Sequence, residues 1–151
     1  MTFPAPLRAL AQSPLFEELQ AKRQRRGSLQ ICGLARPAKA LLASAMAQAE
    51  DRPLLAIAAT LEEAGRWAAL LETMNWDLVR LYPTSEALPD EVLPPDPEIT
   101  WGQMQTLLEM GPTTAIVTTI RAVQPHLPPP PTFREACLSL RVGLEMSLTA
   151  L

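Results

Sequence analysis

Residues 54–71 read Leu-Leu-Ala-Ile-Ala-Ala-Thr-Leu-Glu-Glu-Ala-Gly-Arg-Trp-Ala-Ala-Leu-Leu. The first five are a continuous apolar run, the form taken by a short strand that is buried on both faces. Thr60 and Glu63 then have the spacing of a capping box, in which the threonine hydroxyl accepts from a free N–H at a helix start. The stretch therefore predicts a buried strand followed directly by a helix, which is the repeating unit of α/β proteins.

The same alternation extends along most of the chain. Ser13-Pro14 has the composition of a helix start, and Gly27 that of a helix end. Short apolar runs predict three more strands, at Ser28–Cys32, Leu78–Leu81 and Ala115–Val117. Helical spacing of apolar residues predicts helices over 38–50 and 100–109. Together these elements predict a parallel sheet flanked by helices.

The stretch Gly33-Leu-Ala-Arg-Pro-Ala-Lys39-Ala40 stands where a phosphate-binding loop would stand, between a predicted strand and a predicted helix. A working loop needs glycines for its backbone cradle and a hydroxyl for Mg²⁺ after its lysine. Gly33 and Lys39 are in register, but Ala38 replaces the second glycine and Ala40 the hydroxyl residue. Pro37 also removes one N–H. The sequence predicts a degenerate loop without nucleotide chemistry, no cofactor, no bound metal and no enzymatic activity.

Composition narrows the class of protein. The chain has 151 residues, a net charge of −3 and a hydrophobic fraction of 48%. An acidic balance argues against autonomous DNA binding, because proteins that hold DNA through its phosphates are usually basic. No apolar run has the length of a membrane span. Cys32 and Cys137 lack metal-ligand spacing, so we interpret them as reduced thiols of a cytoplasmic protein, with a disulfide between them as the less favoured alternative.

Two proline-rich stretches divide the chain. Residues 83–97 are expected to run extended over the surface, and Pro128 to Pro131 are expected to form a stiff hinge. After the hinge, Leu138, Leu140 and Val142 alternate with polar residues, which predicts a half-exposed strand. We therefore expect an α/β subdomain over 1–127 and the beginning of a second, truncated α+β subdomain over 128–151.

With these segments in place, the chain resembles the N-terminal, UvrB-like module of bacterial transcription-repair coupling factors (Mfd). The stretches that carry the resemblance are Ser13-Pro-Leu-Phe16, Ile31–Leu42, Thr60-Leu-Glu-Glu-Ala64, Glu86-Ala-Leu-Pro89 with Pro95-Asp-Pro-Glu-Ile99, and Val117–Ala122. The resemblance spans roughly residues 13 to 151, and it rests on the order and spacing of these motifs together.

The resemblance implies a RecA-like subdomain followed by the entry strand of a second subdomain. In the family, this module acts in nucleotide excision repair by contacting UvrA, and it copies the UvrA-binding surface of UvrB without helicase chemistry. The implied partners are UvrA or the remaining domains of the same factor. RNA polymerase and DNA would be engaged only through domains that this chain lacks, and no membrane is implied.

The candidate partner-binding residues are Gln103, Arg121, His126 and Arg141, with Arg134 as a weaker candidate. Gln103 and His126 stand where the family usually has arginine, which would pair with carboxylates. Thr100 and Gln103 also have capping-box spacing, and we favour that interpretation of Gln103. His126 is expected to be an exposed loop residue, Trp67 and Trp101 to be core residues, and Lys39 to be structural or exposed to solvent.

Two other functions stay open on the residues alone. The chain could be a diverged nucleotide-binding domain that retains an anion site at Lys39, because a helix start favours negative charge. It could also be a fragment that is inert without a more complete second subdomain.

Overall fold

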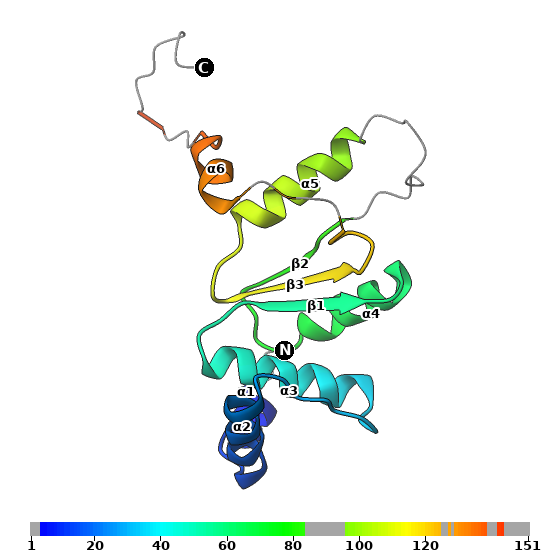
Figure 1. Cartoon of the computed structure of the whole chain (residues 1–151), viewed down its shortest axis with the longest axis vertical. Coiled ribbons are helices and arrows are strands. Elements are labelled where there is room, and N and C mark those ends of the chain that lie inside the picture. The colour runs from blue at the N-terminus through cyan, green and yellow to red at the C-terminus, as the bar shows by residue number, and fades with distance from the viewer. Residues whose placement is uncertain (1–3, 84–95, 125–126, 128, 139–141, 144–151) are drawn as a thin grey trace.

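A computed structural model describes residues 4–83, 96–124, 127, 129–138 and 142–143. The sheet has three parallel strands, β1 (Leu54–Ala58), β2 (Leu78–Leu81) and β3 (Thr114–Thr119), in the order β1-β3-β2. β3 is central, with Leu54 opposite Ala115 on one side and Leu78 opposite Thr114 on the other. The predicted α/β class and parallel sheet are confirmed (Figure 1).

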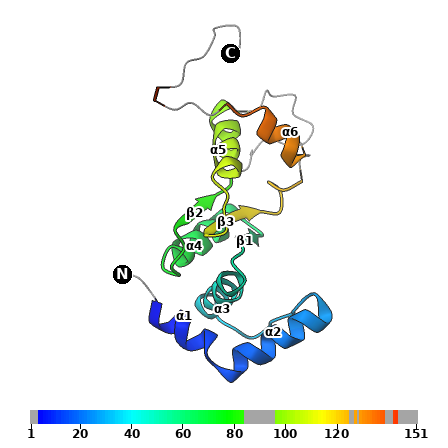
Figure 2. The same ribbon diagram turned by 90° about the vertical axis from the view of Figure 1, so that its left-hand side faces the viewer.

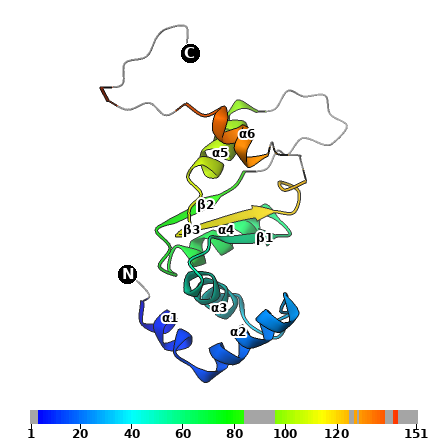
Figure 3. The ribbon, with the colours of Figure 1, turned by 60° about the vertical axis from the view of Figure 1, so that its left-hand side comes forward.

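Helices lie on both sides of this sheet (Figures 1 and 2). α4 (Leu61–Leu71) contacts all three strands, and α3 (Arg36–Ala49) packs against α4 and β1. α1 (Pro4–Ala11) packs on α3, and α2 (Pro14–Arg26) lies beyond it, far from the sheet (Figure 3). α5 (Pro97–Leu108) and α6 (Pro130–Glu135) are on the opposite side.

The main core lies between α4 and the sheet and continues to α3. Leu71, Ala64, Val117 and Ala115 have no exposed surface. Its buried polar groups are paired: the indole Nε1–H of Trp76 donates to the Ser44 hydroxyl at 3.0 Å. A smaller cluster on the other side of the sheet joins Tyr82, Ile116 and Ala122 to α5. The two clusters fix one helix layer on each face.

Local signals explain where several helices begin and end. The Ser13 hydroxyl accepts from the Phe16 N–H at 3.3 Å, and the Thr60 hydroxyl accepts from the Glu63 N–H at 3.2 Å. Gly27 closes α2 in the left-handed conformation, with φ at 71°. A side chain is strained in that conformation, which is why glycine occupies this helix end. The predicted start and end of α2 and the predicted start of α4 are confirmed.

Four expectations are wrong in the described residues. Ser28–Cys32 is not a strand. Leu138 and Val142 are not in a strand either, and Leu140, between them, lies outside the described residues. Pro130 and Pro131 begin a short helix rather than continue a spacer, because proline is tolerated in the first turn. α5 begins after Asp96, whose carboxylate accepts from the Glu98 N–H at 2.9 Å, so it starts earlier than the expected Thr100.

Replacing Ser13 by alanine is expected to lower the free energy of unfolding by about 1 kcal/mol, because the hydroxyl is the side-chain cap of α2. Urea denaturation followed by circular dichroism measures the change. As a matched control, Ser28→Ala removes an exposed hydroxyl outside any helix and should change stability by less than about 0.5 kcal/mol. Equal losses in the two variants would contradict the assigned cap.

An ion pair connects β2 with the end of α5. Arg80 Nε donates to Glu109 Oε2 at 2.7 Å, and Gln105 Nε2 donates to Glu109 Oε1 at 2.9 Å. The hydrogen bond from Gln105, and after it the one from Arg80, hold the pKa of Glu109 below its ordinary value. The carboxylate is therefore favoured in the folded chain.

This lowered pKa sets the direction of a pH effect. Above the ordinary carboxyl pKa, Glu109 should make its full contribution to stability. That contribution should be lost as the pH falls through the lowered pKa that Glu109 has in the folded chain. Glu109→Gln should therefore make the acid limb of a plot of Tm against pH less steep. Glu98→Gln, an exposed change on the same helix, should leave that limb in place. An unchanged acid limb in Glu109→Gln would contradict the assignment.

Candidate functional site

The stretch from Gly33 to Ala40 does not have the geometry of a phosphate-binding loop. The preceding residues 28–32 are not paired with the sheet, and α3 begins at Arg36 with Pro37 in its first turn. Gly33 has φ at 77°, in the left-handed region, and no atom lies within 4 Å of where a Cβ would stand. Its glycine is therefore explained by the turn into α3, without any ligand.

The two residues that follow Ala38 lie on different sides of α3. Ala40 has no exposed surface and belongs to the main core, whereas Lys39 is exposed. The position that would carry a magnesium-binding hydroxyl is thus occupied by core packing. Ala35, the residue before the helix, makes no side-chain capping hydrogen bond. In this structure the stretch that the sequence singled out is therefore a turn followed by the start of α3, with Ala40 packed in the core.

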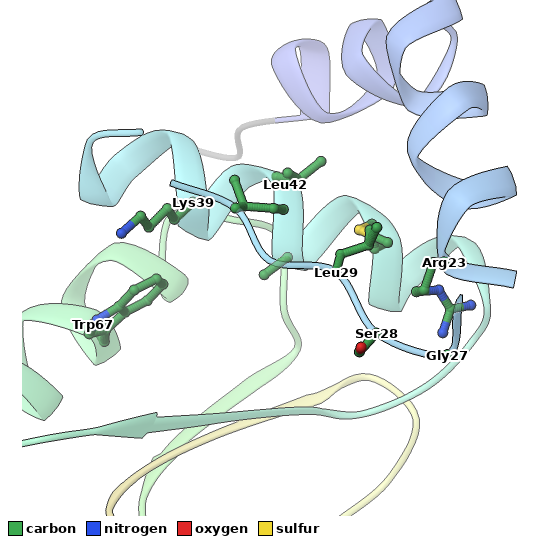
Figure 4. A pocket seen from close by; sticks show the side chains of 10 residues that line it. Arg23, Gly27, Ser28, Leu29, Lys39, Leu42 and Trp67 are labelled. Carbon is green, nitrogen blue, oxygen red and sulfur yellow. The ribbon is translucent and has the colours of Figure 1, made fainter. Parts of the chain in front are cut away.

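Lys39 lies beside a groove, which we call the α3 groove (Figure 4). Its volume is about 460 Å³. It runs between α3 and the segment that joins α2 to α3, with Lys39 and Trp67 toward one end and Arg23 toward the other. Its lining residues are Arg23, Gly27, Ser28, Leu29, Ile31, Lys39, Leu42, Ala43, Met46 and Trp67. Most of its walls are aliphatic, so it suits an apolar ligand with anionic groups at its ends.

Arg23 is held at its end of the groove by an acidic partner. Its guanidinium pairs with the carboxylate of Glu50, which follows the last residue of α3. The Nε atom of Arg23 is nevertheless buried and has no hydrogen-bond partner. A buried donor without a partner is costly, and an acceptor from a ligand would relieve that cost.

The predicted partner-binding residues do not form one site. Gln103 lies within α5, and its Nε2 donates to the Pro83 carbonyl at 3.0 Å, so it ties α5 to the chain after β2. Thr100 is inside the same helix, which excludes the expected capping box. Arg121 is exposed in the turn after β3. His126 and Arg141 lie outside the described residues.

Two expectations about tryptophans have different outcomes. Trp67 on α4 is partly buried against the main core and also lines the α3 groove. Trp101 on α5 is 72% exposed, so its assignment to the core was wrong. Helical spacing identified the apolar side of α5, but only the structure determines which part of that side meets the sheet.

A surface that the sequence did not predict lies on β1. Leu55 and Ile57 point away from the main core and are 55% and 53% exposed. Among the described residues, β1 pairs only with β3, so its other edge has no partner strand. The continuous apolar run suggested burial on both faces, and that expectation was wrong for this face. The strand is covered by α4 on one face only.

The described residues contain neither a metal-binding cluster nor a membrane-spanning helix. Within the described ranges, no group of three or more His, Cys, Asp and Glu side chains could hold a metal ion, and no helix is long and apolar enough to cross a membrane. Cys32 and Cys137 are free thiols. No family model, curated protein or solved structure matches the chain.

Proposed function

We propose that this chain is a non-catalytic protein-interaction module of a transcription-repair coupling factor, acting in nucleotide excision repair in the cytoplasm. Its partner on this proposal is UvrA or the remaining domains of the same factor. RNA polymerase and DNA would be engaged through those other domains. The family part of the proposal rests on the sequence motifs that resemble the UvrB-like module.

The observation that supports an interaction role best is the uncovered side of β1. Leu55 and Ile57 are more than half exposed beside a strand edge that has no partner among the described residues. Contiguous apolar surface on a small domain is typical of a protein contact, and an open edge without charge or proline accepts further strands. A partner covering β1 would bury both features.

The burial of Ala40 near the start of α3 supports the non-catalytic part of the proposal. Ala40 packs in the core at the position where a nucleotide site needs a hydroxyl, and Pro37 lacks one of the cradle donors. We propose that the α/β unit is a diverged RecA-like fold whose loop serves as scaffold. On this view residues 28–32 correspond to the strand before the loop, detached here from the sheet.

Titration with labelled ATP and Mg²⁺ separates this function from the diverged nucleotide-binding domain. We expect no saturable binding to the full chain. Saturable micromolar binding that disappears in Lys39→Ala would contradict the non-catalytic proposal.

Equilibrium binding to purified UvrA tests the partner. We expect saturable binding, weakened at least about tenfold by Leu55→Asp with Ile57→Asp, because both changes place charge in the apolar contact. Leu15→Asp, the same change at a 58% exposed leucine of α2, should leave the affinity unchanged. Absence of any UvrA binding would contradict this partner and leave the remaining domains of the same factor as the proposed one.

A further inference from the structure

Residues 28–32 have the alternation of a strand without a partner strand. Leu29 and Ile31 are partly buried, whereas Ser28, Gln30 and Cys32 are exposed. In the described part of the chain, no backbone hydrogen bond joins this segment to another element. It crosses α3 as an open run of chain (Figure 4). Its backbone N–H and C=O groups are therefore available to a strand that arrives from outside.

Hollows flank the segment, and both contain cations. The α3 groove holds Lys39 and Arg23. A neighbouring hollow of about 660 Å³ shares Ser28, Leu29 and Ile31 with it. That hollow is also lined by Leu19, Lys22, Arg25, Arg26 and Gln30. No aspartate or glutamate lines either one.

Several of these cations lack a carboxylate partner. Lys22 pairs with Glu18 and Arg23 with Glu50. Arg25, Arg26 and Lys39 make no ion pair within the described residues. This concentration of positive charge contrasts with a chain whose net charge is −3. Its electrostatic complement is an acidic ligand.

We propose that residues 28–32, the α3 groove and the neighbouring hollow form a docking site for an acidic, aliphatic peptide segment of a partner protein. The segment adds as a strand along residues 28–32 and places aliphatic side chains against Leu42 and Met46. Its carboxylates pair with Arg25, Arg26 and Lys39. This inference deepens the proposed function and rests on it, because it names the chemistry of a partner segment at a surface separate from the side of β1.

The aliphatic walls favour a peptide over a nucleic acid. Single-stranded nucleic acids bind through stacking on aromatic side chains along a basic groove. Here Trp67 is the one aromatic lining residue, and Leu29, Leu42 and Met46 offer no stacking surface. An extended peptide uses both the unpaired backbone and the aliphatic pockets, which is the mode of strand addition.

Fluorescence anisotropy with the full chain tests the site. The probe is a fluorescein-labelled peptide of alternating valine and aspartate. We expect saturable binding that weakens about tenfold in Arg25→Glu with Arg26→Glu, since two ion pairs of surface type are lost and two repulsions added. Arg52→Glu with Arg66→Glu, the same double charge reversal at two exposed arginines that line neither hollow, should leave the affinity unchanged.

Two further measurements distinguish strand addition from charge attraction alone. A peptide with N-methylated valines cannot donate backbone hydrogen bonds and should bind at least about tenfold more weakly. Hydrogen exchange should show new protection within residues 28–32 on binding of the unmodified peptide. Equal binding of the methylated peptide, or protection at Leu54–Ala58 instead, would overturn the proposed mode.

Other ligands and the proposed function give separate outcomes. A peptide with lysines in place of the aspartates, or a single-stranded oligonucleotide, should bind more weakly. Equal or tighter binding of either would overturn the inference.

The outcomes also separate this inference from the proposed function. If Leu55→Asp with Ile57→Asp abolishes UvrA binding and retains peptide binding, both proposals are supported. Failure of all UvrA binding with peptide binding intact would contradict only that partner. Failure of peptide binding with UvrA binding intact would overturn only the docking site.

Discussion

Replacing Leu71 by alanine is expected to lower the free energy of unfolding by about 2–5 kcal/mol, because Leu71 is the largest side chain among the described residues that is fully buried. Leu71 is the last residue of α4 and has no exposed surface. α4 contacts all three strands and α3, so a cavity at its end loosens the main core where the layers meet. Because small domains are stable by only about 5–15 kcal/mol, this loss is a large share of the total.

Urea denaturation followed by tryptophan fluorescence measures the change in Leu71→Ala. Leu61→Ala is the matched control, because Leu61 begins the same helix and is 45% exposed. That variant should lose less than about 1 kcal/mol, since little apolar surface leaves the interior. Similar losses in the two variants would contradict the position assigned to the main core.

Introducing aspartate at position 40 is expected to cause the second large loss in the free energy of unfolding. Ala40→Asp places a carboxylate where the side chain has no exposed surface, at a cost of about 3–5 kcal/mol. Burial raises the pKa of a carboxyl group, so the penalty should shrink as the pH is lowered through that raised value. The loss should therefore be greatest at neutral pH. Thermal denaturation at several pH values measures both effects.

The same substitution five positions earlier should have the opposite sign. Ala35 precedes α3 and makes no side-chain capping hydrogen bond, so Ala35→Asp supplies an acceptor for the free N–H groups and stabilises by about 1 kcal/mol. A stable Ala40→Asp would mean that position 40 faces solvent. The degenerate loop would then have room for a ligand, and the non-catalytic proposal would lose its structural support.

The elements that follow from local chemistry could be predicted from the sequence. The apolar run at Leu54–Ala58, the cap at Thr60 and the pair Ser13 and Gly27 each act over a few residues, and the structure has a strand or a helix boundary at every one. The parallel arrangement followed from alternation of strands and helices. The order of strands did not, because it depends on which distant segments pair.

Residues 28–32 illustrate the limit of a periodic pattern. Alternating Leu29 and Ile31 predicted a strand, and the alternation of burial is present, but no other element pairs with the backbone among the described residues. A period of two identifies which side chains turn inward, and it does not identify what they pack against. Here they line the α3 groove, so the groove could not be predicted without the path of the chain.

The candidate site was predicted only in part. Lys39 was expected to be structural or exposed to solvent, and it is exposed, yet its neighbours along the groove, Trp67 and Ile31, come from separate elements. Gln103 was placed at a helix start because Thr100 has a capping hydroxyl. In the structure that hydroxyl instead donates to the Asp96 carbonyl at 3.1 Å from within the helix. Competing caps a few residues apart cannot be ranked from propensity alone.

The central place of β3 determines the order in which the chain can fold during synthesis. β1 and β2 both pair with β3 and not with each other, and Leu54 leaves the ribosome about 60 residues before its partner Ala115. At about 5–20 residues per second, the nascent β1 waits roughly 3–12 s for the strand that completes its ladder. During that interval α3 and α4 are the neighbours available to shield it, and the sheet assembles in one late step when β3 emerges.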